Sequence, residues 1–232
     1  DQKNDTLRYT HYDGTSWTDE TVTTDDDNNN GIYNSISLDN NDYPRIAYYN
    51  VTHADLDLAV WDGSTWSFQK VDTMNSVGTY PSISIGTDDL TRIAYTYASQ
   101  SDIKYASSTG TDWNFHTFEG SYSSIVSLGL DDLNNPRISA INIDGTDNVV
   151  LFYNNSNEWI EYNVEDNSGT NSNHPSMFVN SDGTAYIAYV NTGDGFVRYS
   201  TIYTGTIWNK NNIATTGDVS TSYPGLGMHF DR

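Results

Sequence analysis

One phrase of sequence recurs five times along the chain, at intervals of 46 to 49 residues. Each copy is a short stretch rich in Gly, Asn, Ser and Thr that ends in a tryptophan, as in Asp62-Gly63-Ser64-Thr65-Trp66. A period of roughly 40 to 50 residues marks a repeat array in which each copy forms one supersecondary unit. The repeat therefore constrains the architecture before any single residue does. The five tryptophans are Trp17, Trp66, Trp113, Trp159 and Trp208.

Within each repeat, short runs of β-branched and aromatic residues alternate with turn residues. The clearest copy has four such runs, at 35–39, 44–49, 56–61 and 66–71, each bounded by Asp, Asn, Gly or Pro. Four antiparallel strands joined by hairpins form one blade of a β-propeller. We therefore predict an all-β, five-bladed β-propeller. The four strands of each blade are named A to D in chain order. Strand A is expected at the centre of the propeller, and the polar strand D at its outer edge.

The chain does not contain a whole number of repeats, because the first and the last copy are incomplete. The first piece has only strands C and D and the last only strand A, at 225–230, so one blade is expected to be a composite of both ends that lacks strand B. Three explanations stay open: the chain is part of a longer array, a strand from an assembly partner fills the gap, or strand C pairs directly with strand A. We predict a single domain over 1–232, with repeats at about 1–22 (partial), 23–71, 72–118, 119–164, 165–213 and 214–232 (partial).

The composition narrows the possible functions. The chain has 31 acidic and 10 basic residues, a net charge of −21, and such a surface repels nucleic acid and anionic membranes. It has no cysteine, which excludes disulfides and thiolate metal sites, and no apolar run long enough for membrane insertion. The Asn- and Thr-rich, Lys-poor texture favours an extracellular or cell-surface location.

The repeat resembles the propeller repeats of secreted bacterial and archaeal surface proteins, over nearly the whole chain. Its Asp-Gly-x-x-Trp turn between strands C and D is similar to a degenerate Asp-box of sialidase-like propellers. Unlike a full Asp-box, this turn has no Ser or Thr two positions before its Asp and no residue between its Asp and its Gly. In that family the turn lies opposite the active site, so the resemblance implies a structural role for it.

Three arginines, Arg45, Arg92 and Arg137, open strand B in successive repeats. No arrangement like the arginine triad of sialidases is recognised among them. We predict instead that these arginines pair with acids of the neighbouring hairpins, such as Asp39, Asp42, Asp88 and Asp131.

One position just before strand A is aromatic in most repeats and forms the predicted ligand site. Aromatic faces stack on the apolar faces of sugars, and a ring of them is expected near the mouth of the central channel. The alternative is that these side chains pack between neighbouring blades. The ligand-binding candidates are Tyr33, Tyr80, His174 and Tyr223, and the remaining repeat has Ile125 at this position.

A second candidate site is a loop that fits the pattern D-x-[DN]-x-[DN]-G. Calcium loops use this spacing because alternate side chains bring hard oxygen atoms onto one ion. The candidate ligands are Asp26, Asn28, Asn30 and Asn34, with Ca²⁺ as the only cofactor considered. A solvated acidic turn is the alternative, because one ligand is charged and the twelfth position is Ser37 instead of Glu.

These observations favour a non-enzymatic recognition or structural module of a surface or adhesin protein, which binds carbohydrate through a propeller face. The partner is expected to be a glycan or another surface protein. No catalytic residue is assigned, because the five histidines lie at different repeat positions and the loops are similar in every repeat. A glycoside hydrolase or polysaccharide lyase, and a protein–protein scaffold of a cell-surface assembly, are the alternatives.

Overall fold

The computed structural model describes residues 6–22, 30–145, 147–155, 158–164, 172–203 and 206–215. These residues form eighteen β-strands and no helix, and every strand pairing is antiparallel. In this part of the chain there is accordingly no helix that could cross a membrane. The predicted all-β class is confirmed.

The strands form five sheets that follow one another in chain order. The N-terminal sheet has two strands, β1 (Arg8–Tyr12) and β2 (Trp17–Thr21). Blade 1 consists of β3 (Asn30–Leu38), β4 (Pro44–Asn50), β5 (Asp55–Trp61) and β6 (Trp66–Asp72). Blade 2 consists of β7 (Val77–Ile85), β8 (Thr91–Tyr97), β9 (Asp102–Ser108) and β10 (Trp113–Phe118). Blade 3 consists of β11 (Ser127–Leu130), β12 (Pro136–Asn142), β13 (Asn148–Asn155) and β14 (Glu158–Asn163). Blade 4 consists of β15 (Ser172–Val179), β16 (Ala185–Asn191), β17 (Phe196–Tyr203) and β18 (Thr206–Thr215).

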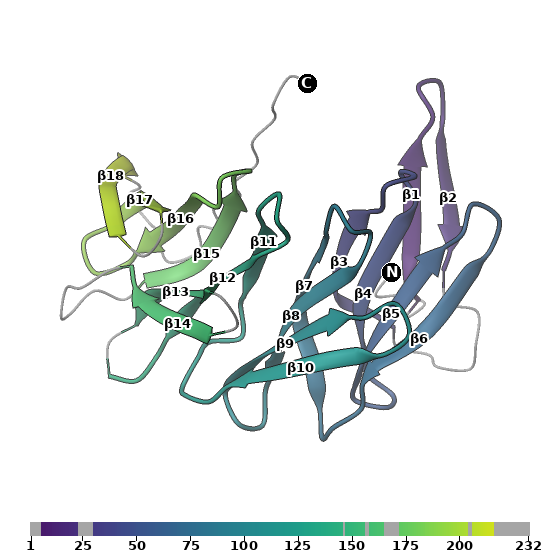
Figure 1. The fold of residues 1–232 in the computed structure, drawn as a ribbon, viewed down its shortest axis with the longest axis horizontal. Helices are drawn as coiled ribbons and strands as arrows, with labels where there is room; N and C mark the ends of the chain where they lie inside the picture. The colour runs from purple at the N-terminus through teal and green to yellow at the C-terminus, as the bar shows by residue number, and fades with distance from the viewer. Residues whose placement is uncertain are drawn as a thin grey trace.

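The blades are arranged around a common centre, as in a β-propeller. Figure 1 shows β3, β7, β11 and β15 on the inner side of the arc and β6, β10, β14 and β18 on the outer side. Neighbouring inner strands pack against each other, β3 on β7, β7 on β11 and β11 on β15. The prediction that strand A is central and strand D peripheral is therefore confirmed.

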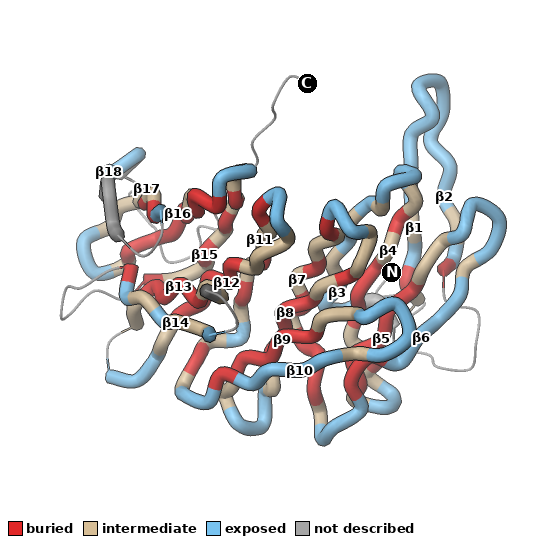
Figure 2. Tube along the Cα trace, in the orientation of Figure 1, coloured by how far each residue is buried: buried red, intermediate tan, exposed pale blue. Residues whose placement is uncertain are grey.

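The core lies in the seams, the packed surfaces between adjacent blades. One cluster joins Ala47 and Leu58 of blade 1 to Ile83 and Ile93 of blade 2, and corresponding clusters join blade 2 to blade 3 and blade 3 to blade 4. Figure 2 shows the buried residues concentrated on the inner and middle strands, with exposed residues along β6 and β10. Each blade thus buries its apolar faces against its neighbours.

In blade 1 the recurring turn before the tryptophan is a hairpin capped by its aspartate. Asp62 Oδ1 accepts hydrogen bonds from the backbone N–H groups of Ser64 and Thr65, both at 2.8 Å, which lowers the pKa of Asp62 to about 2. Gly63 has φ 96°, a left-handed conformation that glycine adopts without a Cβ penalty. Asp13 caps the corresponding turn of the N-terminal sheet in the same way. These contacts give the turn a structural role, and its similarity to the Asp-box stays a resemblance in sequence pattern.

The three strand-B arginines pair with hairpin acids, as predicted. Arg92 lies 2.7 Å from Asp88, and Arg137 lies 3.9 Å from Asp131. Arg45 lies 3.2 Å from Asp39 and takes its second carboxylate, at 2.8 Å, from Asp89 of the next blade instead of from Asp42. These arginines fasten the loops that connect strands A and B.

The composite blade is described only in part. The N-terminal sheet supplies its strands C and D, which contact blade 1 through Leu7 and Val22 in a cluster with Ile46 and Tyr48. Residues 225–230, the predicted strand A, lie outside the described residues. The three explanations for the missing strand B therefore stay open, and the single-domain boundary at 1–232 stays a prediction.

Candidate functional site

The structure gives three of the predicted ligand residues one shared backbone conformation. Tyr33, Tyr80 and His174 have φ 54°, 49° and 53°, which is rare for residues other than glycine. Each lies at an irregularity in the pairing of strand A with strand B of its blade. The predicted equivalence of these positions is thus real. Ile125 departs from it, because its strand, β11, begins only at Ser127, and Tyr223 lies outside the described residues.

Two of these side chains are brought together between blades 1 and 2. The rings of Tyr33 and Tyr80 have centroids 4.0 Å apart, and the Tyr80 hydroxyl donates a hydrogen bond to the Tyr33 hydroxyl at 3.2 Å. His174 is half-buried on blade 4, and burial lowers its pKa. The contact between the tyrosines is the packing expected of the alternative interpretation, and a ligand role for this position stays a prediction.

The predicted calcium loop falls mostly outside the described residues. Asp26 and Asn28 are not among them, whereas Asn30 opens β3 and Asn34 lies further along it, opposite Tyr48. Within the described ranges, no group of three or more His, Asp or Glu side chains could hold a metal ion. Calcium binding at this loop stays a prediction.

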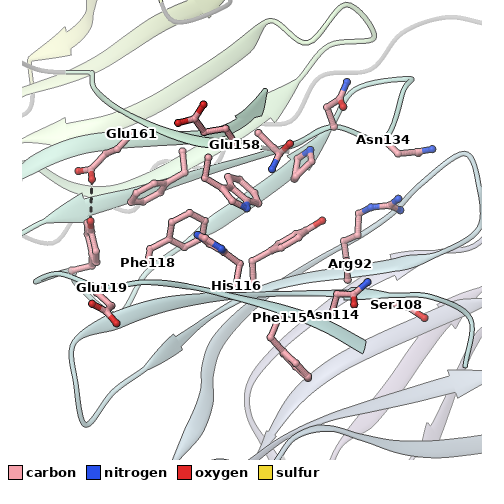
Figure 3. A pocket seen from close by; sticks show the side chains of 18 residues that line it. Arg92, Ser108, Asn114, Phe115, His116, Phe118, Glu119, Asn134, Glu158 and Glu161 are labelled. Carbon is pink, nitrogen blue, oxygen red and sulfur yellow. Dashed lines mark hydrogen bonds between the residues drawn. The ribbon is translucent and has the colours of Figure 1, made fainter. Parts of the chain in front are cut away.

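A candidate site that the sequence did not predict is a cleft of about 800 Å³ in the seam between blades 2 and 3. Figure 3 shows it from close by, with His116 and Phe118 of β10 on one side and Glu158 and Glu161 of β14 on the other. Its floor is apolar and buried, and its rim is polar and exposed. The floor consists of Tyr105, Phe118, Tyr122 and Phe152, and the rim includes Asn114, His116, Glu119, Asn134, Glu158 and Glu161.

Trp159, the recurring tryptophan of blade 3, forms the aromatic wall of this cleft. Its ring stacks on His116 with centroids 5.6 Å apart and an interplanar angle of 24°. The edges of Tyr105 and Phe118 meet it at 5.2 and 4.9 Å. Three side chains of blade 2 thus fix the tryptophan that β14 presents across the seam.

The polar groups of the cleft are also held in place. Glu161 accepts a hydrogen bond from the Tyr122 hydroxyl at 3.2 Å, and burial together with the Glu161 charge raises the pKa of that tyrosine. Arg92 is anchored at its own hairpin by two hydrogen bonds to Asp88 and one to the Leu90 carbonyl. Burial raises the pKa of Tyr105 to about 12, so its hydroxyl is neutral and can donate a hydrogen bond.

The charge of the cleft is negative at neutral pH. Three carboxylates line it, those of Glu119, Glu158 and Glu161, and its one guanidinium, on Arg92, already pairs with Asp88. His116 is exposed at the rim, but its neighbours in the cleft partly desolvate the ring, which lowers its pKa and keeps the imidazole neutral at neutral pH. Such a site suits a neutral ligand that offers hydroxyl groups to carboxylate and amide side chains and an apolar face to an aromatic ring.

Sequence analysis missed this site, although the sequence contains a signal for it. The tryptophan recurs in every repeat, so it identifies no particular seam. What distinguishes the seam after blade 2 is the change from Leu58 to Tyr105 and from Gln69 to His116 between equivalent positions of β5 and β9, and of β6 and β10. A comparison of the repeats for departures at these inward-facing positions could have found it.

The fold defines this protein as a β-propeller, and solved structures of other propellers resemble it. The chain is similar to the Aleuria aurantia lectin, solved in complex with Fucα1-6GlcNAc, with TM-score 0.59 and 14% identity over 95% of this chain and 74% of that one. It is similar to the SapL1 lectin, solved in complex with α-methyl fucoside, with TM-score 0.58 and 15% identity over 90% and 74%. An ulvan lyase of a polysaccharide lyase family also matches, with TM-score 0.58 and 14% identity over 88% of this chain and 60% of that one. At these identities the similarity shows the shared fold alone. No protein-family model matches the chain, and neither does the sequence of any curated protein.

Proposed function

We propose that this protein is a non-enzymatic carbohydrate-binding propeller that binds a neutral saccharide in the cleft between blades 2 and 3. The observation that carries the proposal is the wall formed by Trp159 and His116 above a buried aromatic floor, with Glu161 and asparagine amides at the rim. An aromatic ring beside fixed hydrogen-bonding groups is the arrangement that a sugar needs, since one sugar face is apolar and its edge carries hydroxyl groups.

Two further observations support this proposal. The cleft volume of about 800 Å³ lies in the usual range for small-molecule sites and accommodates a short oligosaccharide. Two structural neighbours were solved with fucose-containing ligands, so α-fucosides are the first saccharides to test. The negative rim disfavours sulfated or uronic polysaccharides, because their anions would lie beside Glu158 and Glu161.

A glycan array, followed by calorimetric titration with the saccharides it identifies, tests the proposal. We expect binding by the native chain and a loss of about tenfold or more in affinity for His116→Ala. Gln69→Ala, at the equivalent position of the preceding seam, should bind like the native chain. If no neutral glycan binds, or if both variants bind like the native protein, the proposal is wrong.

The lyase alternative has one specific observation in its favour. His116 and the neutral Tyr105 hydroxyl, which can transfer protons, line the cleft together with Arg92, and an ulvan lyase is among the structural neighbours. An acidic rim is poorly suited to a uronic acid substrate, so we favour binding. Incubation with ulvan and with neutral polysaccharides decides between the two, because chain cleavage with the accumulation of unsaturated ends would establish a lyase.

The acidic composition and the Asn- and Thr-rich repeats support an extracellular or cell-surface location, in a surface or adhesin protein whose other partners include surface proteins. Cleavage by protease added to intact cells tests this location, and complete protection would contradict it. Calcium at Asp26, Asn28, Asn30 and Asn34 would stabilise the fold, and equal thermal midpoints with calcium and with chelator would exclude it.

A further inference from the structure

Two tyrosines from neighbouring blades are in direct contact between the inner strands β3 and β7. The rings of Tyr33 and Tyr80 have centroids 4.0 Å apart and an interplanar angle of 39°, and their hydroxyl oxygens lie 3.2 Å apart. At this separation the ring carbons of the two residues are in van der Waals contact. The stacked pair of Tyr186 and Tyr199 in blade 4 is more widely spaced, with centroids 6.1 Å apart. The contact between blades 1 and 2 is thus unusually close.

The backbone holds this contact in place from both sides. Before Tyr80, the Val77 backbone N–H donates a hydrogen bond to the Ala54 carbonyl of blade 1 at 3.1 Å. After Tyr80, the Ile83 backbone N–H donates one to the Ser35 hydroxyl of blade 1 at 3.3 Å. Two hydrogen bonds between the blades therefore bracket the tyrosine pair along β7. Because the strand is fastened on either side, the two rings are positioned beside each other before any reaction takes place.

The pair is also accessible from solvent. Tyr33 is 36% exposed and Tyr80 is half-buried, so a small oxidant can approach both phenols. A phenol that loses one electron also releases its hydroxyl proton, and the radical that results is shared between the oxygen and the ring carbons ortho to it. Since each ortho carbon is bonded to the carbon that carries the oxygen, two oxygens 3.2 Å apart bring ortho carbons of the two rings close together. The chain has no cysteine, so a covalent bond between its blades cannot be a disulfide.

We propose that Tyr33 and Tyr80 form an oxidative cross-linking site, which joins blades 1 and 2 through a dityrosine bond. A one-electron oxidant takes one electron from each ring, and each hydroxyl group releases its proton to water. The two radicals then form one carbon–carbon bond between ortho carbons, and the proton on each of these carbons moves to the oxygen of its own ring. Overall the pair loses two electrons and two protons, and both hydroxyl groups are restored. The site is independent of saccharide binding.

Photo-oxidation of the native protein followed by peptide mapping tests the proposal. Brief illumination with a ruthenium tris-bipyridyl complex supplies the one-electron oxidation, and persulfate accepts the electrons and is reduced to sulfate. We expect dityrosine fluorescence in the monomer, with a yield that does not depend on protein concentration. Trypsin then identifies the linked residues, because the peptide 71–92 has Tyr80 as its only tyrosine and Tyr33 lies in the peptide 9–45. A link of 71–92 to any other peptide, or a monomer without dityrosine, would overturn the proposal.

Conservative substitutions show which phenols are required. Tyr33→Phe and Tyr80→Phe should each lower the yield of the linked peptides by about tenfold or more, because the second phenol is no longer held beside the first. Tyr186→Phe is the matched control, since it removes a phenol from the more widely spaced pair of blade 4, and it should cross-link like the native chain. Equal yields from Tyr33→Phe and Tyr186→Phe would contradict the proposal. The thermal midpoint of each variant before oxidation controls for folding.

Two measurements on the unsubstituted chain complete the test. Oxidation of the chain unfolded in urea should give far less of the link between 9–45 and 71–92, because the fold no longer positions the two rings. An equal yield from the folded and the unfolded chain would overturn the proposal. The cross-linked protein should also unfold at a thermal midpoint several degrees higher than the untreated protein, since the bond joins residues 47 positions apart and so constrains the unfolded chain. An unchanged midpoint would show that the bond does not fasten the two blades.

Discussion

The two seams on either side of blade 2 are built from the same repeat positions, yet they hold cavities of about 320 and 800 Å³. The smaller one, between blades 1 and 2, is lined by Leu58, Val60 and Gln69 below Trp113. The larger one has Tyr105, Ser107 and His116 at the equivalent positions, below Trp159. The tryptophan is common to both, so the size and polarity of the site are determined by the side chains that face it.

The Asp89 carboxylate explains much of why the seam between blades 1 and 2 is narrower than the seam between blades 2 and 3. Arg45 reaches across its seam to the Asp89 carboxylate at 2.8 Å and to the Asp89 carbonyl at 2.7 Å. The residue equivalent to Asp89 in the next hairpin is Asn134, whose side chain accepts a hydrogen bond from Thr87 N–H instead. Without a carboxylate opposite it, Arg92 stays with Asp88 of its own blade. The seam after blade 2 therefore lacks the arginine bridge that closes the seam before it.

The closed seam also contains a buried ion pair between Lys104 and Asp72. Tyr95 donates a hydrogen bond to the same carboxylate at 2.6 Å, and the ammonium group lies over the rings of Tyr97 and Phe115 at 5.7 and 5.6 Å. The equivalent positions at the open seam are Val150 and the exposed Glu119. The seam between blades 1 and 2 is thus stabilised by a buried ion pair, whereas the seam between blades 2 and 3 has the Glu119 carboxylate at the cleft.

The largest effect is expected from breaking this ion pair. Asp72→Ala leaves the Lys104 ammonium buried without a counterion, which costs about 3–5 kcal/mol and lowers the thermal midpoint by roughly 10 °C. Glu119→Ala, its equivalent at the open seam, should change the midpoint little. Thermal unfolding followed by circular dichroism measures both, and equal midpoints for the two variants would contradict the contrast drawn here.

Converting the open seam to the composition of the closed one should remove saccharide binding. Tyr105→Leu combined with His116→Gln replaces both aromatic side chains by those of blade 1, and we expect affinity to fall by about tenfold or more, which corresponds to a loss of at least ~1.4 kcal/mol. Calorimetric titration measures the affinity, and the thermal midpoint controls for folding. Unaltered affinity in a folded double variant would place the binding site elsewhere.

A smaller effect is expected from Asn134→Asp. The new carboxylate should draw Arg92 across the seam, as Asp89 draws Arg45, and so narrow the entrance of the cleft. We expect affinity to fall several-fold, with a small gain in stability from the added ion pair of about 0–1 kcal/mol. Asn114→Asp, on the exposed rim of the cleft, serves as a control for added charge alone, and a similar loss for both variants would indicate charge instead of closure.

The smallest effect concerns pH. Burial lowers the pKa of His116, so as pH falls the unfolded chain takes up a proton before the folded chain does. The contribution of neutral His116 to the free energy of unfolding is therefore complete above the ordinary histidine pKa of about 6.5. It is lost as pH falls below that value and through the lower pKa of the folded state. His116→Gln should flatten the thermal midpoint between pH 7 and pH 5 by a few degrees at most. His174→Gln should flatten it in a similar way, because burial lowers that pKa too.

The sequence predicted the features that depend on neighbours along the chain. The alternation in 44–49 and the turn residues around Gly63 predicted strands and hairpins, because strand periodicity and turn chemistry are local. The arginine pairs were also predictable, since Arg92 and Asp88 belong to one hairpin. The cleft was not predicted, because its depth depends on packing between residues about 45 positions apart, such as His116 and Trp159, and its one local signal is the departure from the repeat at Tyr105 and His116. The strained conformation shared by Tyr33 and Tyr80 was likewise invisible in their side-chain types.

The positive-φ position shared by β3, β7 and β15 determines which repeats can replace one another. Tyrosine and histidine are accommodated there at positive φ, but a β-branched side chain is strongly disfavoured in that region. The repeat that has isoleucine here, at Ile125, lacks this conformation, and its connection places Tyr122 in the floor of the cleft, bridged to Asn142. The repeats are therefore not interchangeable at this connection. A chimaera with repeat 72–118 in place of repeat 119–164 would reproduce the scaffold but lose Tyr122 from the floor of the cleft.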